Sequence, residues 1–208
     1  VILKDNGNLH KAENFTRKAI EINPNFADAH SNLGLILKNL GNLLEAESSL
    51  HKALELNPNL AEAHCNLGRI QRDFGNLKEA ECSTKKAIAL KPTFFNSHFL
   101  LATIFIKQER IEEAEAPLRK AIELNPHIAD THSNLGLILN YLGKSKEAEF
   151  SFCKAIELNP DLIEPYLNLG NIFMEQEKLN QAEILSKKAM SKRPWSIIGS
   201  YSFNRRIK

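Results

Sequence analysis

The chain has 208 residues, a formal net charge of +2, and a composition that is 43% hydrophobic and 25% charged. These values are ordinary for a soluble globular protein, and so small a charge gives no reason to expect nucleic acid as a partner. The apolar runs are too short to span a membrane. The three cysteines, Cys65, Cys82 and Cys153, have neither the spacing of a metal site nor the even number of a disulfide framework, which favours a reducing, cytoplasmic setting.

A period of 34 residues organises the sequence. Six of the eight prolines recur at this interval: Pro24, Pro58, Pro92, Pro126, Pro160 and Pro194. A fixed period of this length is typical of repeated supersecondary elements that stack on one another. We therefore read the chain as an array of repeats and take its domain organisation from the period.

The stretch 27–60 shows the pattern inside one repeat. Leu33 and Leu37 share one face of a first helix, and Gly41 ends this helix because glycine is well suited to a helix C-terminus. A second helix follows and stops before Pro58, since the residue that precedes a proline is disfavoured in the helical region. Neither helix is long enough to be stable alone in water, so each must bury its apolar stripe on a partner.

The same pattern along the chain predicts five helix pairs. Their expected ranges are 27–40/43–56, 61–74/77–90, 95–108/111–122, 129–142/145–158 and 163–176/179–191. Complete repeats are expected at 27–60, 61–94, 95–128, 129–162 and 163–196. Residues 1–26 align as a partial repeat, with the end of a first helix and a whole second helix, and residues 197–208 as a truncated start of a further repeat or a frayed cap.

The repeat at 95–128 is degenerate. Ala102 replaces the glycine at the helix-packing position and Glu109 replaces the glycine of the turn, while Pro117 falls within the second helix. A proline in a helix interior removes one backbone hydrogen bond and costs ~3 kcal/mol. We expect a kink or a local opening near Glu113, and the alternative is a slightly shifted helix start.

One set of residues recurs in register and carries a family resemblance. In the repeat 27–60 the set is His30, Leu33, Gly34, Leu37, Ala46, Leu50, Ala53 and Pro58. It resembles the tetratricopeptide repeat (TPR), with histidine where that family often has tryptophan or tyrosine. The resemblance implies an all-α fold: a right-handed α-solenoid, or superhelix, of antiparallel helix pairs with a concave groove that holds a peptide or a partner protein.

Two recurring patterns could suggest chemistry. The histidines recur at the same position of four repeats, but stacked repeats lie ~10 Å apart, whereas zinc ligands lie ~2 Å from the metal. The recurring Glu-Ala-Glu segments place two carboxylates two residues apart on a helix, where they point away from each other. We therefore expect the histidines (His30, His64, His98, His132) to pack in the interior. We expect no metal, no cofactor and no enzymatic activity.

The face of each first helix that lies opposite the apolar stripe is the candidate binding surface. Its second position carries acidic residues in four repeats, namely Asp28, Glu62, Asp130 and Glu164, and its sixth position carries asparagine in four, namely Asn32, Asn66, Asn134 and Asn168. An amide offers both a donor and an acceptor, so it can pair with a peptide backbone whatever the peptide's side chains. The alternative is that duplicated repeats have merely kept the same residue.

The repeat 95–128 interrupts the asparagines with Leu100. Together with Phe99 and Ile106, this leucine is expected to form an apolar patch between polar positions, where one apolar side chain of a partner docks. The competing possibility is that Phe99 packs inward against the neighbouring repeat.

A second resemblance concerns the segment that starts at Phe26, FADAHSNLG. It resembles the repeats of the O-linked N-acetylglucosamine transferases, in which a ladder of asparagines holds the backbone of the substrate polypeptide. No residue of that family's catalytic domain is present. Basic residues at Lys38, Arg69 and Arg72 keep open a weaker form of the clamp by which chaperone-binding TPR proteins hold a terminal carboxylate.

Two functions follow from the sequence. The first is a non-catalytic scaffold that binds an extended peptide or protein segment in the concave groove. The alternative is the substrate-receiving arm of a larger enzyme, such as an O-GlcNAc-transferase-like glycosyltransferase. In both cases the expected partner is protein.

Overall fold

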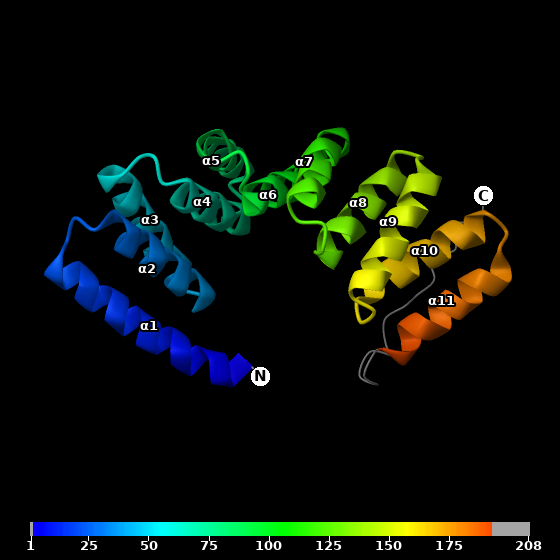
Figure 1. The fold of residues 1–208 in the computed structure, drawn as a ribbon, viewed down its shortest axis with the longest axis horizontal. Coiled ribbons are helices and arrows are strands. Elements are labelled where there is room, and N and C mark those ends of the chain that lie inside the picture. The colour runs from blue at the N-terminus through cyan, green and yellow to red at the C-terminus, as the bar shows by residue number, and fades with distance from the viewer. Residues whose placement is uncertain (1, 193–208) are drawn as a thin grey trace. The chain divides into compact units, whose positions relative to one another are not determined.

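A computed structural model describes the backbone of residues 2–192 and the side chains of residues 8–192, and all regular elements in this part of the chain are α-helices (Figure 1). They are α1 (Ile2–Ile22), α2 (Ala27–Asn39), α3 (Leu43–Leu56), α4 (Ala61–Phe74), α5 (Leu77–Leu90), α6 (Phe95–Lys107), α7 (Ile111–Leu124), α8 (Ala129–Tyr141), α9 (Ser145–Leu158), α10 (Ile163–Glu175) and α11 (Leu179–Ser191). The all-α fold is thus confirmed. The expected segment 197–208 lies outside the described residues.

The chain divides into two compact units, residues 1–126 and residues 127–208. Unit 1 contains α1 to α7, and unit 2 contains α8 to α11. In each unit the even-numbered helices are the first helices of the repeats, and the odd-numbered helices from α3 onward are the second helices.

Two local features differ from the sequence expectation. The alignment of residues 1–26 predicts a turn near Gly7, but α1 continues through this residue as one helix. Likewise α7 is unbroken through Pro117 and runs to Leu124, so the expected opening near Glu113 is absent. Burial of the apolar face of α7, formed by Ala114, Leu118 and Ala121, offsets the cost of the proline.

Each helix pair is held mainly by buried apolar side chains. In the repeat 27–60 the first helix contributes Leu33 and Leu37, and the second contributes Leu50, all of them buried in one cluster that extends into the next repeat through Ile70. At Gly34 a side chain would meet Leu50 at 2.6 Å, so only glycine lets these two helices approach so closely. The core is therefore a chain of neighbouring interfaces, as expected for stacked repeats.

The turn between the two helices of a repeat requires a left-handed residue. Gly41, Gly75 and Gly143 have φ of 87°, 86° and 74°, a region that glycine enters without steric cost. Glu109 and Glu177 occupy the same position in their repeats and are held at φ of 60°. These two glutamates carry backbone strain that the glycine-containing turns avoid.

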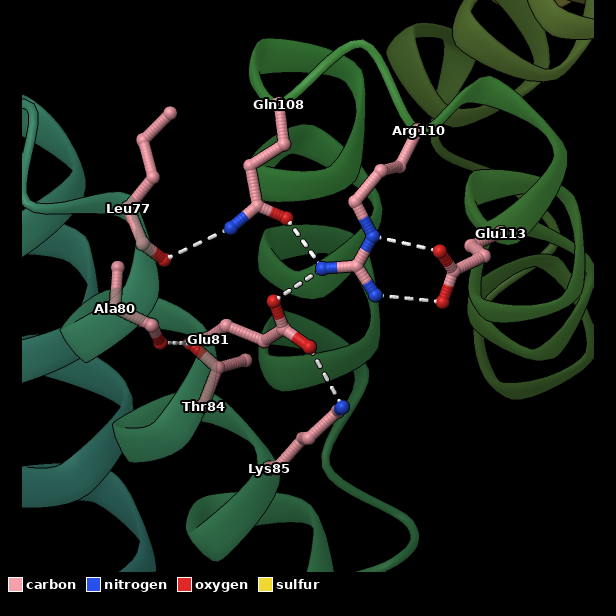
Figure 2. Close-up of polar contacts among 8 residues, drawn as sticks. All are labelled: Leu77, Ala80, Glu81, Thr84, Lys85, Gln108, Arg110 and Glu113. Atoms are coloured by element: carbon pink, nitrogen blue, oxygen red, sulfur yellow. Dashed lines mark hydrogen bonds and ion pairs between the residues drawn. The ribbon is translucent and has the colours of Figure 1, made fainter.

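An ionic clasp in unit 1 joins α5 to the turn between α6 and α7 (Figure 2). The Arg110 guanidinium donates to Glu113 at 2.6 Å through both Nε and Nη2, and to Glu81 on α5 at 2.6 Å through Nη1. Gln108 donates to the carbonyl oxygen of Leu77 at 3.2 Å, so the turn is also tied to the start of α5. The bonds to Glu113 and Glu81 raise the pKa of Arg110.

The first helices form a continuous layer within each unit. In unit 1, α2 packs on α4 and α4 on α6, whereas the second helices α3 and α5 make no comparable contact; in unit 2, α8 packs on α10 while α9 and α11 do not meet in this way. We call the outward surface of these first helices the first-helix face.

Candidate peptide-binding surface

The recurring histidines hold the loops between repeats. In unit 1, Nε2 of His30, His64 and His98 lies 2.8, 2.9 and 2.8 Å from the carbonyl oxygens of Pro24, Pro58 and Pro92. A carbonyl only accepts hydrogen bonds, so Nε2 carries the proton and donates. Tyr166 takes the same role in unit 2 and donates through its hydroxyl to Pro160 at 3.2 Å. The sequence showed the position of these side chains but not this hydrogen bond. The available signal was a histidine or tyrosine six residues after Pro24, Pro58, Pro92, Pro126 and Pro160.

The asparagines of the sixth position lie on the first-helix face. Asn32 is exposed, and Asn66, Asn134 and Asn168 are half-buried. In unit 1 the difference has a simple cause. Asn66 lies on α4, which packs beside both α2 and α6, whereas among the described residues α2 packs beside one other first helix, α4. The acidic residues of the second position, Asp28, Glu62, Asp130 and Glu164, are all exposed, and Glu62 accepts an ion pair from Lys91 at 3.3 Å.

Leu100 does not lie on the exposed surface. It is 2% exposed and belongs to the buried cluster that includes Cys65 and Ile104. An apolar side chain at the sixth position turns into the seam between α4 and α6, because burial there removes it from water. An amide at this position stays partly hydrated, because burying it without hydrogen bonds would cost free energy. The predicted patch centred on Leu100 is therefore corrected, and this residue is removed from the candidate surface.

Its two expected neighbours stay partly accessible. Phe99 is half-buried and its ring stacks on Phe95, with ring centroids 6.0 Å apart and an interplanar angle of 15°. Ile106 is also half-buried. Both remain candidates, but without Leu100 they do not make the continuous patch that the sequence suggested.

Exposed apolar residues occur instead on the first-helix face of unit 2. Leu137 and Tyr141 lie one turn apart on α8 and are 45% and 71% exposed, while Met174 on α10 is 49% exposed. Sequence reasoning did not select these residues. The available signal was large apolar residues at positions that do not pack.

The first-helix face of unit 1 has the opposite character. Arg69 and Arg72 on α4 and Lys38 on α2 lie toward the C-terminal ends of their helices, and Arg72 reaches across to donate to Thr103 on α6 at 3.1 Å. Burial lowers the pKa of Lys38, and the positive charge of Arg69 lowers it further. These residues are basic and partly buried, whereas the same positions in unit 2 are uncharged.

Among the residues that the structure describes, no three histidine, cysteine, aspartate or glutamate side chains converge on a possible ion site. None of the helices described here combines the length and the apolar character that a membrane span requires.

Antiparallel helix pairs with a 34-residue period and a small residue at each close crossing define a class of helical repeat protein. Comparison with family models gives the family: "Tetratricopeptide repeat" models match residues 25–93, 95–128 and 129–162, and a "TPR repeat" model matches residues 4–41. The chain belongs to the tetratricopeptide-repeat family.

Solved structures agree in fold. YrrB, described as a TPR protein with an unusual peptide-binding site, is 26% identical with a TM-score of 0.73, covering 87% of this chain and 93% of that one. MamA is 27% identical with a TM-score of 0.71, covering 77% of this chain and 94% of that one. PilF of Pseudomonas aeruginosa is 26% identical with a TM-score of 0.74, covering 81% and 77% respectively. A comparison with curated proteins gives no match.

Proposed function

We propose that this protein is a non-catalytic interaction scaffold that binds an extended segment of a partner protein along the first-helix face. The observation that carries the proposal is the amide at the sixth position, which recurs on this face at Asn32 and Asn66 in unit 1 and at Asn134 and Asn168 in unit 2. Each of these amides is at least partly accessible, so each can pair with a peptide group of the bound segment.

The spacing of the asparagines suits an extended chain. Adjacent packed helices lie ~8–10 Å apart, and an extended chain advances ~3.3 Å per residue. Asn32 and Asn66, on the neighbouring helices α2 and α4, would therefore meet peptide groups about three residues apart. This arrangement would hold the backbone of the bound segment and leave its intervening side chains free. Binding by the asparagines would therefore depend little on the sequence of that segment.

The comparisons support the same kind of function. The chain belongs to a family of repeats, and one related structure is described as having a peptide-binding site. A reducing, cytoplasmic location remains part of the proposal, because Cys65, Cys82 and Cys153 are all free thiols and two of them are exposed.

The test compares Asn32→Ala plus Asn66→Ala with Asn59→Ala, an exposed loop asparagine in the same unit. Binding to a set of unrelated synthetic peptides is measured by fluorescence anisotropy. Loss of two hydrogen bonds at ~1 kcal/mol each should weaken every peptide by roughly thirtyfold, whereas the control should bind normally. If the double variant binds every peptide as tightly as the wild type, the asparagines are relics of duplication and the proposal fails.

A substrate-receiving arm of a larger enzyme is the second candidate. The observation in its favour is the same set of asparagines in register, which would suit a polypeptide on its way to a catalytic domain. The scaffold is the simpler proposal, since it requires only residues 2–192, and the asparagine variants test the shared binding step of both.

A further inference from the structure

Two buried clusters of unit 1 meet within the repeat 61–94. On α4, Leu67 and Ile70 belong to a cluster that they share with α2 and α3. The buried alanines of α5 belong to a second cluster, which contains residues of α6 and, from α4, Cys65. The two helices of this repeat therefore bury most of their apolar side chains in different clusters. We call the boundary at which α4 meets α5 and α6 the α4 joint.

Polar side chains occupy positions at the α4 joint that are apolar in other repeats. Gln71 is buried where the other complete repeats carry leucine or phenylalanine, and it accepts a hydrogen bond from Ser83 on α5 at 2.8 Å. Thr84 is fully buried where three of the other repeats carry leucine or phenylalanine. The joint thus buries less apolar surface than its equivalents do, which lowers the free energy that holds it closed.

A buried hydroxyl weakens the same joint. Ser97 on α6 is fully buried beside Cys65, and its hydroxyl has no oxygen or nitrogen partner among the described residues. A thiol is a weak hydrogen-bonding group, so most of the cost of removing this hydroxyl from water is not recovered. Opening the joint would return the hydroxyl to water.

His64 brings a titratable group into the joint. Its ring is 6% exposed, and its Nε2 donates to the carbonyl oxygen of Pro58 at 2.9 Å. Burial lowers the pKa of His64, and the positive charge of Lys86 on α5 lowers it further; together they outweigh the hydrogen bond to Pro58, which acts to raise it. The helices packed on α4 are α2, α3, α5 and α6, and Lys86 is the one charged side chain of the described residues that acts on His64. On α4 itself, the exposed Glu62 pairs with Lys91 at 3.3 Å.

The charge of Lys86 lacks the partner that its counterparts have. In three other repeats the lysine at this position pairs with a glutamate three residues later, at distances of 3.0, 2.7 and 2.9 Å: Lys52 with Glu55, Lys120 with Glu123 and Lys154 with Glu157. In the repeat 61–94 this glutamate is replaced by Ala89. No carboxylate at this position therefore offsets the cation that lies near His64.

We propose that the α4 joint is an acid-sensitive device: protonation of His64 separates α4 from α5 and α6. The inference goes beyond the proposed function and holds whatever the first-helix face binds. In the closed joint the neutral imidazole is favoured, whereas in the open joint His64 is in water and takes up a proton at its ordinary pKa of 6.5. The open state therefore binds more protons. The closed state is favoured well above pH 6.5 and loses this advantage as the pH falls below that value.

The size of the effect has an upper limit. At pH 5.5 a histidine in water is protonated about ten times more often than it is neutral, and at pH 7.5 the ratio is reversed. If His64 stays neutral in the closed joint, the ratio of open to closed molecules rises about tenfold between pH 7.5 and pH 5.5. Protons that the closed joint also takes up reduce this rise.

The experiment measures opening by the reactivity of a buried thiol in the full-length chain. Cys65 is 1% exposed within the joint, whereas Cys82 on α5 is exposed. The folded protein is treated with a methanethiosulfonate reagent at pH 7.5 and pH 5.5, and mass spectrometry of its proteolytic peptides gives the rate of modification at each cysteine. Dividing the rate at Cys65 by the rate at Cys82 corrects for the pH dependence of the reagent, so the ratio reports the open fraction.

Two variants alter the device, and a third is the matched control. His64→Tyr keeps a donor for the proline carbonyl without titrating near neutral pH, as Tyr166 does in unit 2. Ala89→Glu gives Lys86 the missing partner and leaves His64 in place. His98→Tyr makes the same substitution one repeat later, at a half-buried ring that donates to Pro92.

Between pH 7.5 and pH 5.5 the ratio should rise by up to about tenfold in the wild type and in His98→Tyr. It should stay constant in His64→Tyr and rise less than in the wild type in Ala89→Glu, while circular dichroism shows unchanged helix content. A constant ratio in the wild type, a full rise in His64→Tyr, or a rise abolished in His98→Tyr overturns the proposal. A rise accompanied by loss of helix throughout the chain overturns it too, because the whole protein then unfolds. If His64→Tyr does not fold, Ala89→Glu decides, and a rise equal to that of the wild type refutes the device.

Discussion

Replacing Gly136 with alanine should destabilise unit 2, because the position has no room for a methyl group. A Cβ built on Gly136 lies 2.7, 2.8 and 3.0 Å from Cε1, Cδ1 and Cγ of Phe152. The ring of Phe152 is fully buried, so it cannot move away into solvent. The two helices α8 and α9 must then separate or the ring must leave its preferred rotamer.

The expected change in the free energy of unfolding is the difference between two opposing effects. Alanine is better than glycine in a helix interior by ~1 kcal/mol, whereas overpacking a close-fitting core costs ~1–3 kcal/mol. Gly170 is the matched control in the same unit, since its added Cβ would lie 3.8 Å from the nearest atoms, an ordinary contact. Gly170→Ala should stabilise the protein by ~1 kcal/mol. The helix-propensity gain is common to both variants, so the gap between them, ~1–3 kcal/mol, measures the packing cost.

The free energies of unfolding are to be measured by urea titration with circular dichroism as the signal. A rescue variant strengthens the test: Gly136→Ala combined with Phe152→Leu reproduces the pair Ala102 and Leu118, which are both fully buried in the repeat 95–128. In the Phe152→Leu background the alanine should cost less. If Gly136→Ala is as stabilising as Gly170→Ala, the close approach of α8 and α9 does not hold and the reasoning is refuted.

Two further predictions concern the turn and clasp of unit 1. Glu109→Gly should raise the free energy of unfolding by ~0.5–1 kcal/mol, because glycine removes the strain at φ of 60°; Glu79→Gly, within helix α5, should lower it, and a loss of stability in both variants would contradict the strain at the turn. Partial burial acts to raise the pKa of Glu81, but hydrogen bonds from Lys85 and Arg110 outweigh it and lower the pKa. The resulting stability is present at neutral pH and is lost as the pH falls below the ordinary value of 4.5. Arg110→Gln should therefore lower the melting temperature more at neutral pH than in acid, and an equal effect at both would exclude the ionic contribution.

The local structure could be predicted from the sequence because its signals are local. Apolar residues at helical spacing, a left-handed turn position and a proline after each second helix lie within one 34-residue period, and each acts over a few residues. The observed bounds of α4, from Ala61 to Phe74, match the predicted range, and those of α5 do as well. Where local rules compete with packing they fail, and α7 continues through Pro117 because burial of its apolar face offsets the cost of the proline.

The candidate surface depended on tertiary structure, because accessibility depends on which helix lies beside which. The period placed Leu100 in the same series as the asparagines, but the neighbouring helix α4 covers its position and leaves it 2% exposed. The approach of Lys38 to Arg69 likewise joins residues of different repeats, and only the packing of α2 beside α4 brings them together. The sequence by itself determined the helices and their order. The contacts between successive repeats decided which side chains a partner can reach, since burial and charge repulsion arise only once those helices meet.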